Sequence, residues 1–192
     1  MKRNLQKLVT TLPDVEDVLL FGSAVRGKVQ PKDIDILILF KKKVDKHSEY
    51  LIRKELENYY SNLSIVSKTL TTALEPTFDA RESILFEGVS LLSRKNLAQT
   101  YGFVSFGMFK YAVKGWSNVQ KTKFYYALNG RSGNGGILRE YHSMRLSDNI
   151  VLTPIESIEP MRDFLDSWQI RYLYIPVVIP ARLQHARILQ QL

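Results

Sequence analysis

Two aspartates, Asp33 and Asp35, stand two positions apart at the start of an apolar segment that ends at Phe40. Side chains at positions i and i+2 of a β-strand point to the same face, so the two carboxylates would lie side by side. Such a pair suits Mg²⁺, or Mn²⁺ in its place, because the ion takes one or two protein carboxylates and completes its shell with water and phosphate oxygens. We therefore interpret Asp33 and Asp35 as metal ligands and catalytic residues.

A Gly-Ser pair, Gly22 and Ser23, precedes the aspartates and follows a second apolar segment. Glycine allows the backbone to approach a ligand closely. Ser23 is expected to begin a short helix, either as its cap alone or as part of a phosphate site, since helix N-termini attract phosphate. Arg26 could reach a triphosphate with its guanidinium or lie on the surface as an ordinary arginine. Gly22, Ser23 and Arg26 are therefore the candidate nucleotide-binding residues.

The aspartate pair alone has a simpler interpretation, a polar strand end that faces solvent. The Gly-Ser pair, separated from Asp33 by nine residues, favours the metal–nucleotide interpretation, because a phosphate-binding turn and a metal site would then lie on adjacent strands.

This arrangement resembles a known family. An apolar segment, Gly-Ser, nine residues and Asp-Ile-Asp-Ile are similar to the motif of the DNA polymerase beta-type nucleotidyltransferase superfamily. The form Gly-Ser-Ala-Val-Arg-Gly is most similar to the minimal nucleotidyltransferases of archaea and bacteria. The resemblance covers residues 1–95 and implies a nucleotidyltransferase fold there, a mixed sheet with flanking helices.

The resemblance also implies a third metal-binding carboxylate on the third strand, and the equivalent position here is Ser64. A serine hydroxyl is a neutral ligand and cannot act as a carboxylate base. Three acidic residues that follow, Glu75, Asp79 and Glu87, are candidates to approach the site from another element. This departure leaves open whether the chemistry is retained.

Composition excludes several classes of protein. With no cysteine among 192 residues, the chain has no disulfide, thiolate metal site or cysteine nucleophile, which fits a cytoplasmic location. Its apolar runs are too short to cross a bilayer, so no membrane partner is expected. The net charge of +8 favours nucleotides or nucleic acid as partners, with a solubilising surface as the alternative.

The order of elements predicts two α+β domains, residues 1–95 and 96–192. The first is expected to contain four strands and four helices. Its strands are Val15–Phe21, Ile34–Phe40, Leu63–Val66 and Val89–Leu92, and its helices are Leu5–Leu12, Ser23–Gly27, His47–Tyr60 and Phe78–Glu87.

The second domain is predicted to be a smaller, ferredoxin-like βαββαβ unit that ends in a helix. Its expected elements are the aromatic-rich strand region Thr100–Trp116, helix Val119–Leu128, strands Ile137–Tyr141 and Ile150–Thr153, helix Ile158–Trp168, strand Arg171–Ile179 and helix Ala181–Leu192.

The rings of Tyr101, Phe103, Phe106, Phe109 and Tyr111 could form a base-stacking sheet face or, as aromatic residues more often do, a core.

Three hypotheses for function follow. The first is a Mg²⁺-dependent nucleotidyltransferase that moves NMP from an NTP, such as ATP, to a hydroxyl acceptor. The second is a catalytically impaired relative that binds nucleotide or nucleic acid. The third is a subunit of a two-component system that works with a partner protein.

Overall fold

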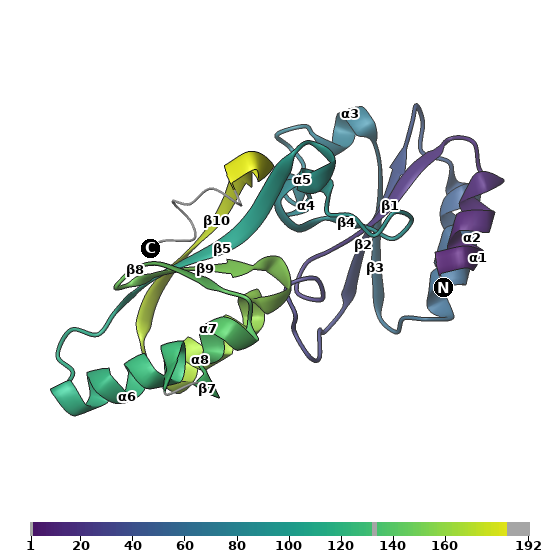
Figure 1. Cartoon of the computed structure of the whole chain (residues 1–192). Helices are drawn as coiled ribbons and strands as arrows, with labels where there is room; N and C mark the ends of the chain where they lie inside the picture. Colours follow the sequence, from purple (N-terminus) through teal and green to yellow (C-terminus); the bar gives the residue numbers. More distant parts are fainter. Residues whose placement is uncertain (1, 132–133, 184–192) are drawn as a thin grey trace. The chain divides into compact units, whose positions relative to one another are not determined.

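The computed structural model describes residues 2–131 and 134–183 (Figure 1). The chain is mixed α+β, with one mixed sheet and one antiparallel sheet. Its contacts divide it into two compact units, and the division falls between Tyr101 and Gly102. Within the described ranges, no helix is long and apolar enough to span a membrane.

The first unit contains a four-stranded mixed sheet in the order β3-β2-β1-β4. Strand β1 is antiparallel to β2 and β4, whereas β2 and β3 are parallel. The elements are α1 (Lys2–Thr10), β1 (Val15–Phe21), β2 (Ile34–Phe40), α2 (Lys46–Glu57), β3 (Leu63–Thr69), α3 (Leu70–Ala73), α4 (Arg81–Glu87), β4 (Val89–Ser90) and α5 (Leu97–Thr100).

Strand β2 lies in the middle of this unit because its apolar residues face both ways. Ile36, Ile38 and Phe40 pack in a core with residues of α1 and α2. Leu37 and Leu39 pack in a second core with residues of α3 and α4. Helices therefore cover both sides of the sheet (Figure 1), as the nearly continuous apolar sequence of β2 predicts.

The predicted helix Ser23–Gly27 is wrong. Residues 23–27 form turns instead. Gly22 and Gly27 bracket the segment with φ values of +80° and +86°, in the left-handed region that an α-helix does not use. The turn is too short to propagate a helix between two such residues.

The second unit contains a four-stranded sheet in the order β10-β5-β9-β8, with all neighbours antiparallel. Strands β6 and β7 pair separately as a two-stranded ribbon. The elements are β5 (Phe103–Ala112), α6 (Asn118–Asn129), β6 (Gly130–Arg131), β7 (Asn134–Gly135), α7 (Ile137–Glu140), β8 (Met144–Ser147), β9 (Ile150–Pro154), the 3₁₀ helix η1 (Ile155–Ser157), α8 (Ile158–Ser167), β10 (Arg171–Pro180) and the 3₁₀ helix η2 (Ala181–Leu183).

The predicted strand Ile137–Tyr141 is also wrong, because helix α7 occupies this segment and the strand, β8, begins at Met144. Leu138, Arg139 and Glu140 are strong helix formers, and Gly136 turns the chain into the helix. Most of the predicted C-terminal helix, residues 184–192, lies outside the described residues.

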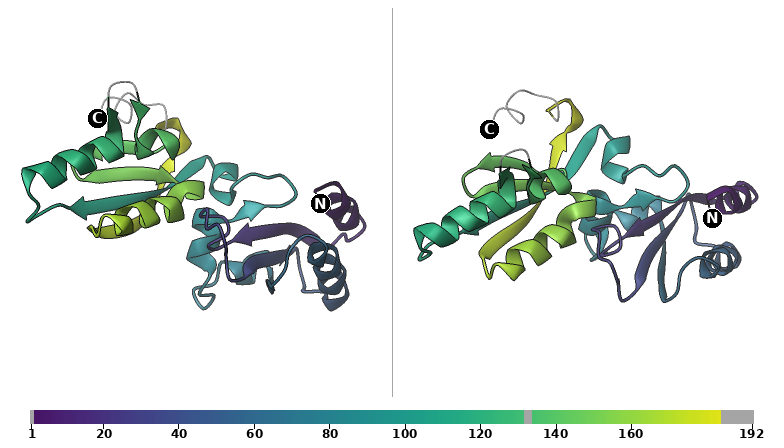
Figure 2. Two further views of the ribbon diagram at one scale, coloured as in Figure 1. Left: turned by 90° about the horizontal axis from the view of Figure 1, so that it is seen from below. Right: turned by 60° about the horizontal axis from the view of Figure 1, so that its bottom comes forward.

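Helices α6 and α8 cover one face of the second sheet (Figure 2), and the rings of Phe124 and Phe164 stack between them at 5.8 Å. Under the helices, Phe109 contacts Tyr172 and Tyr174. Phe106, Phe109 and Tyr111 are all buried, which decides between the two interpretations of the aromatic run. These three rings form core and are not a base-stacking face; Tyr101 and Phe103 of the same set are exposed.

The substitution Ile38→Ala tests the central role of β2. Ile38 is fully buried, so we expect unfolding to become easier by about 2–5 kcal/mol through lost transfer energy and the cavity left behind. Urea denaturation followed by circular dichroism measures this loss. The matched control is Val29→Ala, because Val29 is 92% exposed and its truncation should change the stability little.

Candidate functional site

The candidate site is built where the end of β1 passes the beginning of β2. The antiparallel register places Phe21 opposite Asp35, and Gly22 follows directly with a φ of +80°. A Cβ atom at position 22 would collide with Oδ2 of Asp35. The bend therefore faces the carboxylate, and only glycine fits there.

The turn after Gly22 is closed by its own backbone. The amide of Val25 donates to the Gly22 carbonyl at 3.1 Å, and the amide of Lys28 donates to the Ser23 carbonyl at 3.1 Å. Ser23 is half-buried at the start of this turn. It caps no helix, so a phosphate role for Ser23 has to rest on the turn itself.

Asp35 and Ser64 lie side by side. Asp35 is the second residue of β2, and the parallel register pairs it with Ser64 of β3. The Ser64 side chain lies near enough to the Asp35 carboxylate to lower its pKa. Asp33 precedes the strand and is exposed, whereas Asp35 is half-buried. The structure therefore brings Gly22, Asp35 and Ser64 together, with Asp33 near enough for its charge to act on Asp35.

The charges around Asp35 oppose its ionisation. Burial raises the pKa of Asp35, and the nearby carboxylate of Asp33 raises it further. The neighbouring Ser64 hydroxyl and the positive charge of Arg26 lower the pKa, but they only partly compensate. Two carboxylates that repel each other would be stabilised by a cation between them.

These donors fit a single hard cation, since two carboxylates and one hydroxyl are all oxygen ligands. Across the described parts of the chain, no group of three or more Asp, Glu, His or Cys side chains gathers to hold a metal ion. Glu75 and Asp79 therefore do not complete the site as a third carboxylate. The neutral Ser64 occupies the place beside Asp35 instead.

Glu87, one of the three acidic residues expected to approach the site, does approach it, but as an anchor of the turn. It is the last residue of α4, and its side chain is only 1% exposed. Its Oε1 accepts hydrogen bonds from Nη1 of Arg26 at 2.7 Å and from the Gly22 amide at 3.0 Å. Its Oε2 accepts from Nη1 of Arg26 at 3.0 Å. Glu87 thus fixes both ends of the turn.

The signal for this role is present in the sequence. Glu87 ends the apolar run Ile84-Leu85-Phe86, and a carboxylate in such a run is buried only when it is paired. The basic partner is Arg26, which was a candidate above for contacting a triphosphate.

The family model described as "Polymerase beta, Nucleotidyltransferase" matches residues 3–96. Residues 3–96 belong to the polymerase beta-type nucleotidyltransferase family. The match spans the whole of the mixed sheet, and with it the bend at Gly22 and the strand that bears Asp35. No curated protein matches the chain.

Three solved structures show a weak likeness to this chain. Two are mutant forms of the MntA–HpeT toxin–antitoxin, 17% and 18% identical, which cover 47% and 46% of this chain and 71% and 68% of their own, with TM-scores of 0.36 and 0.30. The third contains a tri-AMPylated Shewanella oneidensis HEPN toxin with the MNT antitoxin, 18% identical, 47% and 71% covered, with a TM-score of 0.28. The family membership does not depend on these likenesses.

Substitution of Glu87 tests whether this residue anchors the turn after Gly22. In Glu87→Ala, the guanidinium of Arg26 and the amide of Gly22 lose a buried acceptor, so we expect a loss of about 2–3 kcal/mol in unfolding free energy. The value is discounted because Arg26 is 26% exposed. Chemical denaturation provides the measurement.

The matched control for this substitution is Glu82→Ala on the same helix. The Glu82 side chain is 87% exposed and pairs with Arg81 at 3.6 Å, so its removal should cost little. Equal effects of the two substitutions would contradict an anchoring role for Glu87.

The titration of Asp35 provides a second test. Its folded pKa lies above the ordinary 3.8, so the stability that it contributes is complete below that value and is lost as the pH rises through the folded pKa. Asp33→Asn removes a repulsive charge and should lower the pKa. Ser64→Ala removes a neighbouring hydroxyl that lowers the pKa, so it should raise the pKa.

Carboxyl ¹³C NMR of the metal-free protein measures these pKa values directly. If the Asp35 midpoint in each variant equals the midpoint in the native protein, neither neighbour acts on this carboxylate.

Proposed function

We propose that the protein is a Mg²⁺-dependent nucleotidyltransferase that transfers NMP from an NTP to a hydroxyl acceptor. The observation that carries this proposal is the approach of the Gly22 backbone to the Asp35 carboxylate within a domain of this family. In such an arrangement a triphosphate and a cation can occupy one site.

Each residue has a distinct role in the proposed reaction. Asp33 and Asp35 would hold Mg²⁺, or Mn²⁺, which when bound neutralises the charge of the phosphates. The turn at Gly22 and Ser23 allows phosphate oxygens to approach the backbone, because no side chain stands at Gly22. Arg26 adds a positive charge that is felt at Asp35. Positioning and charge neutralisation are the main requirements of phosphoryl-type transfer.

The acceptor hydroxyl attacks the α-phosphorus, the bond to the bridging oxygen breaks, and pyrophosphate leaves. Ser64 cannot take the hydroxyl proton as a carboxylate would, so in this proposal the proton passes to solvent. The reaction is therefore expected to depend on the intrinsic acidity of the acceptor.

Ser64 also favours a second candidate function. With Ser64 beside Asp35, the domain could retain nucleotide or nucleic-acid binding without transfer, alone or as a subunit of a two-component system. In that case no residue would take over the role of the carboxylate that activates the acceptor hydroxyl.

We also propose that the second unit is ferredoxin-like. In support, its antiparallel order β10-β5-β9-β8 places the first and third strands of a βαββαβ unit in the centre and the fourth and second at the edges.

Incubation with radiolabelled NTPs, Mg²⁺ or Mn²⁺ and a range of hydroxyl acceptors tests the transfer reaction. We expect label transfer by the native chain and a loss of about 10²–10³-fold or more in Asp33→Asn/Asp35→Asn, because the site loses the charges that hold the cation. The matched control is Asp14→Asn, since Asp14 is exposed and outside the site.

Two outcomes separate the candidates. Nucleotide binding without transfer would favour the impaired relative, especially if Ser64→Asp then introduces activity. Transfer that survives in the double variant would exclude the proposed site.

A further inference from the structure

The charges of the second unit are segregated between its two long helices. Between Gly88 and Arg139 the chain contains no acidic residue. Helix α6, in the middle of this stretch, carries Lys121 and Lys123. Helix α8 instead carries Glu159, Asp163 and Asp166 with one arginine. Helix α6 itself therefore has a net positive charge, which attracts anions.

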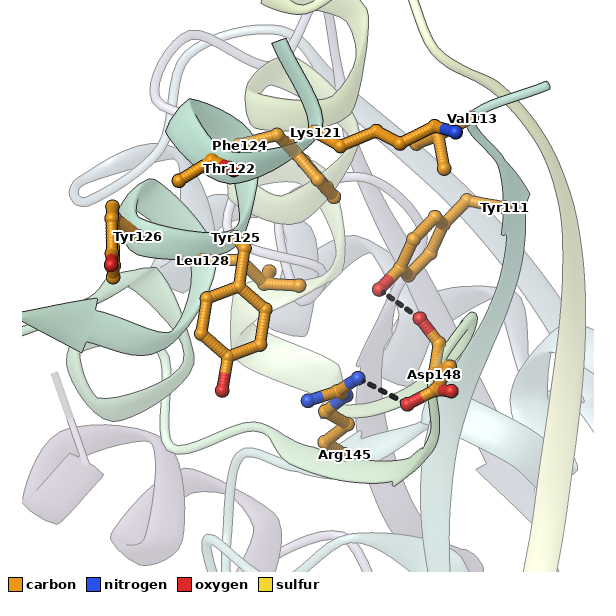
Figure 3. Close-up of a pocket in the computed structure, with 10 residues that line it drawn as sticks. All are labelled: Tyr111, Val113, Lys121, Thr122, Phe124, Tyr125, Tyr126, Leu128, Arg145 and Asp148. Carbon is orange, nitrogen blue, oxygen red and sulfur yellow. Dashed lines mark hydrogen bonds and ion pairs between the residues drawn. The ribbon is translucent and has the colours of Figure 1, made fainter. Parts of the chain in front are cut away.

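A pocket of about 400 Å³ lies between α6 and the turn that joins β8 to β9 (Figure 3). Its lining includes Tyr111, Lys121, Tyr125, Arg145 and Asp148. In Figure 3, Tyr125 and Tyr111 stand on two sides of the pocket, and Arg145 and Asp148 lie along its border. The volume is within the range of ligand sites.

The arginine of this pocket is fixed in place. Arg145 donates from Nη2 to Oδ1 of Asp148 at 2.6 Å and from Nε to the Ser147 carbonyl at 3.1 Å. Its guanidinium carbon lies 5.5 Å from the centroid of the Tyr125 ring. The Tyr111 hydroxyl donates to the Asp148 carbonyl at 2.9 Å, which holds the turn against the sheet. The pocket is therefore preformed, with a cation against an aromatic ring.

A second hollow of about 390 Å³ lies on the neighbouring side of α6, lined by Lys123, Tyr126 and Arg131 among others. The arrangement repeats there, because the guanidinium carbon of Arg131 lies 5.1 Å from the centroid of the Tyr126 ring. The rings of Tyr125 and Tyr126 are 5.9 Å apart and are 48% and 41% exposed. Two exposed rings, each paired with an arginine, thus stand next to each other.

We propose that this surface binds single-stranded nucleic acid. We call it the α6 surface and define it by Lys121, Lys123, Tyr125, Tyr126, Arg131 and Arg145. One base stacks on Tyr125 in the first pocket, and a neighbouring base stacks on Tyr126 in the second. Aromatic stacking together with basic groups that follow the phosphates is the general basis of single-strand binding.

The features of the α6 surface favour a strand over other anions. A duplex hides its base faces, so it could not use the two rings. A free nucleotide would fill one hollow and leave the other empty. An acidic peptide would use the lysines but would gain nothing from the paired tyrosines. This inference goes beyond the proposed transfer reaction and concerns a different unit of the chain.

Fluorescence anisotropy with the full chain and a 5′-labelled ten-nucleotide oligo(U) or oligo(dT) tests the proposal. NTPs and divalent metals are omitted, so a failure here is distinct from a failure of the transfer reaction. We expect Tyr125→Ala to weaken binding by about 5- to 150-fold, as for the loss of one stacked base. Tyr126→Ala should have a comparable effect.

The matched control is Tyr50→Ala on α2 of the first unit. Tyr50 is 54% exposed and has Lys54 5.8 Å from its ring, so it shares the exposure and the cation contact but lies outside the α6 surface. Its substitution should leave binding unchanged. In a plot of the logarithm of the affinity against the logarithm of the salt concentration, Lys121→Gln/Lys123→Gln should make the slope less negative by about 1.4. This corresponds to about 0.7 for each phosphate that a lysine no longer neutralises.

Equal binding by Tyr125→Ala and Tyr50→Ala would overturn the proposal, because Tyr125 would then contribute no stacking. Equal affinity for a duplex of the same sequence would also overturn it, and so would displacement of the strand by poly-glutamate at equal charge. Complete displacement by an equimolar mononucleotide would also overturn it, since the pocket would then be a nucleotide site. Tyr125 is exposed, so its truncation should leave the fold intact, and circular dichroism verifies this.

Discussion

The candidate site depends on one steric constraint, the absence of space between the backbone at residue 22 and the carboxylate of Asp35. The constraint arises because β1 and β2 are antiparallel neighbours and Phe21 is paired with Asp35. It is maintained because the apolar residues of β2 pack in two cores, which fix the position of the strand that bears Asp35. The same packing that stabilises the first unit therefore positions its chemistry.

Much of this arrangement could be predicted from the sequence, and the reasons are local. Strand β2 has the predicted bounds because a strand buried on both faces needs an unbroken apolar run. The pairing of Asp35 with Ser64 follows once β3 is recognised as its parallel neighbour. The predicted helix at Ser23 failed because two glycines with positive φ bracket the segment, and φ cannot be read from residue type alone.

Other features depend on tertiary contacts that no local pattern contains. The role of Glu87 requires α4 to dock beside the turn, more than sixty residues away in sequence. In the second unit, β5, β9 and β10 and the helices α6 and α8 were predictable, whereas β6, β7 and α7 were not, and one strand was assigned to the segment that forms α7. Which aromatic residues are buried was not predictable, because Phe109 and Tyr125 are both aromatic and differ in what covers them.

The bond from the Gly22 amide to Glu87 has a consequence for dynamics. The acceptor is the buried side chain of the last residue of α4, so exchange of the amide proton requires Glu87 to release it. Deuterium uptake at this single proton would therefore report how often Glu87 releases the turn. A partner that binds α4 and holds Glu87 in place would slow that uptake. It would thereby stabilise the turn after Gly22 without contacting it.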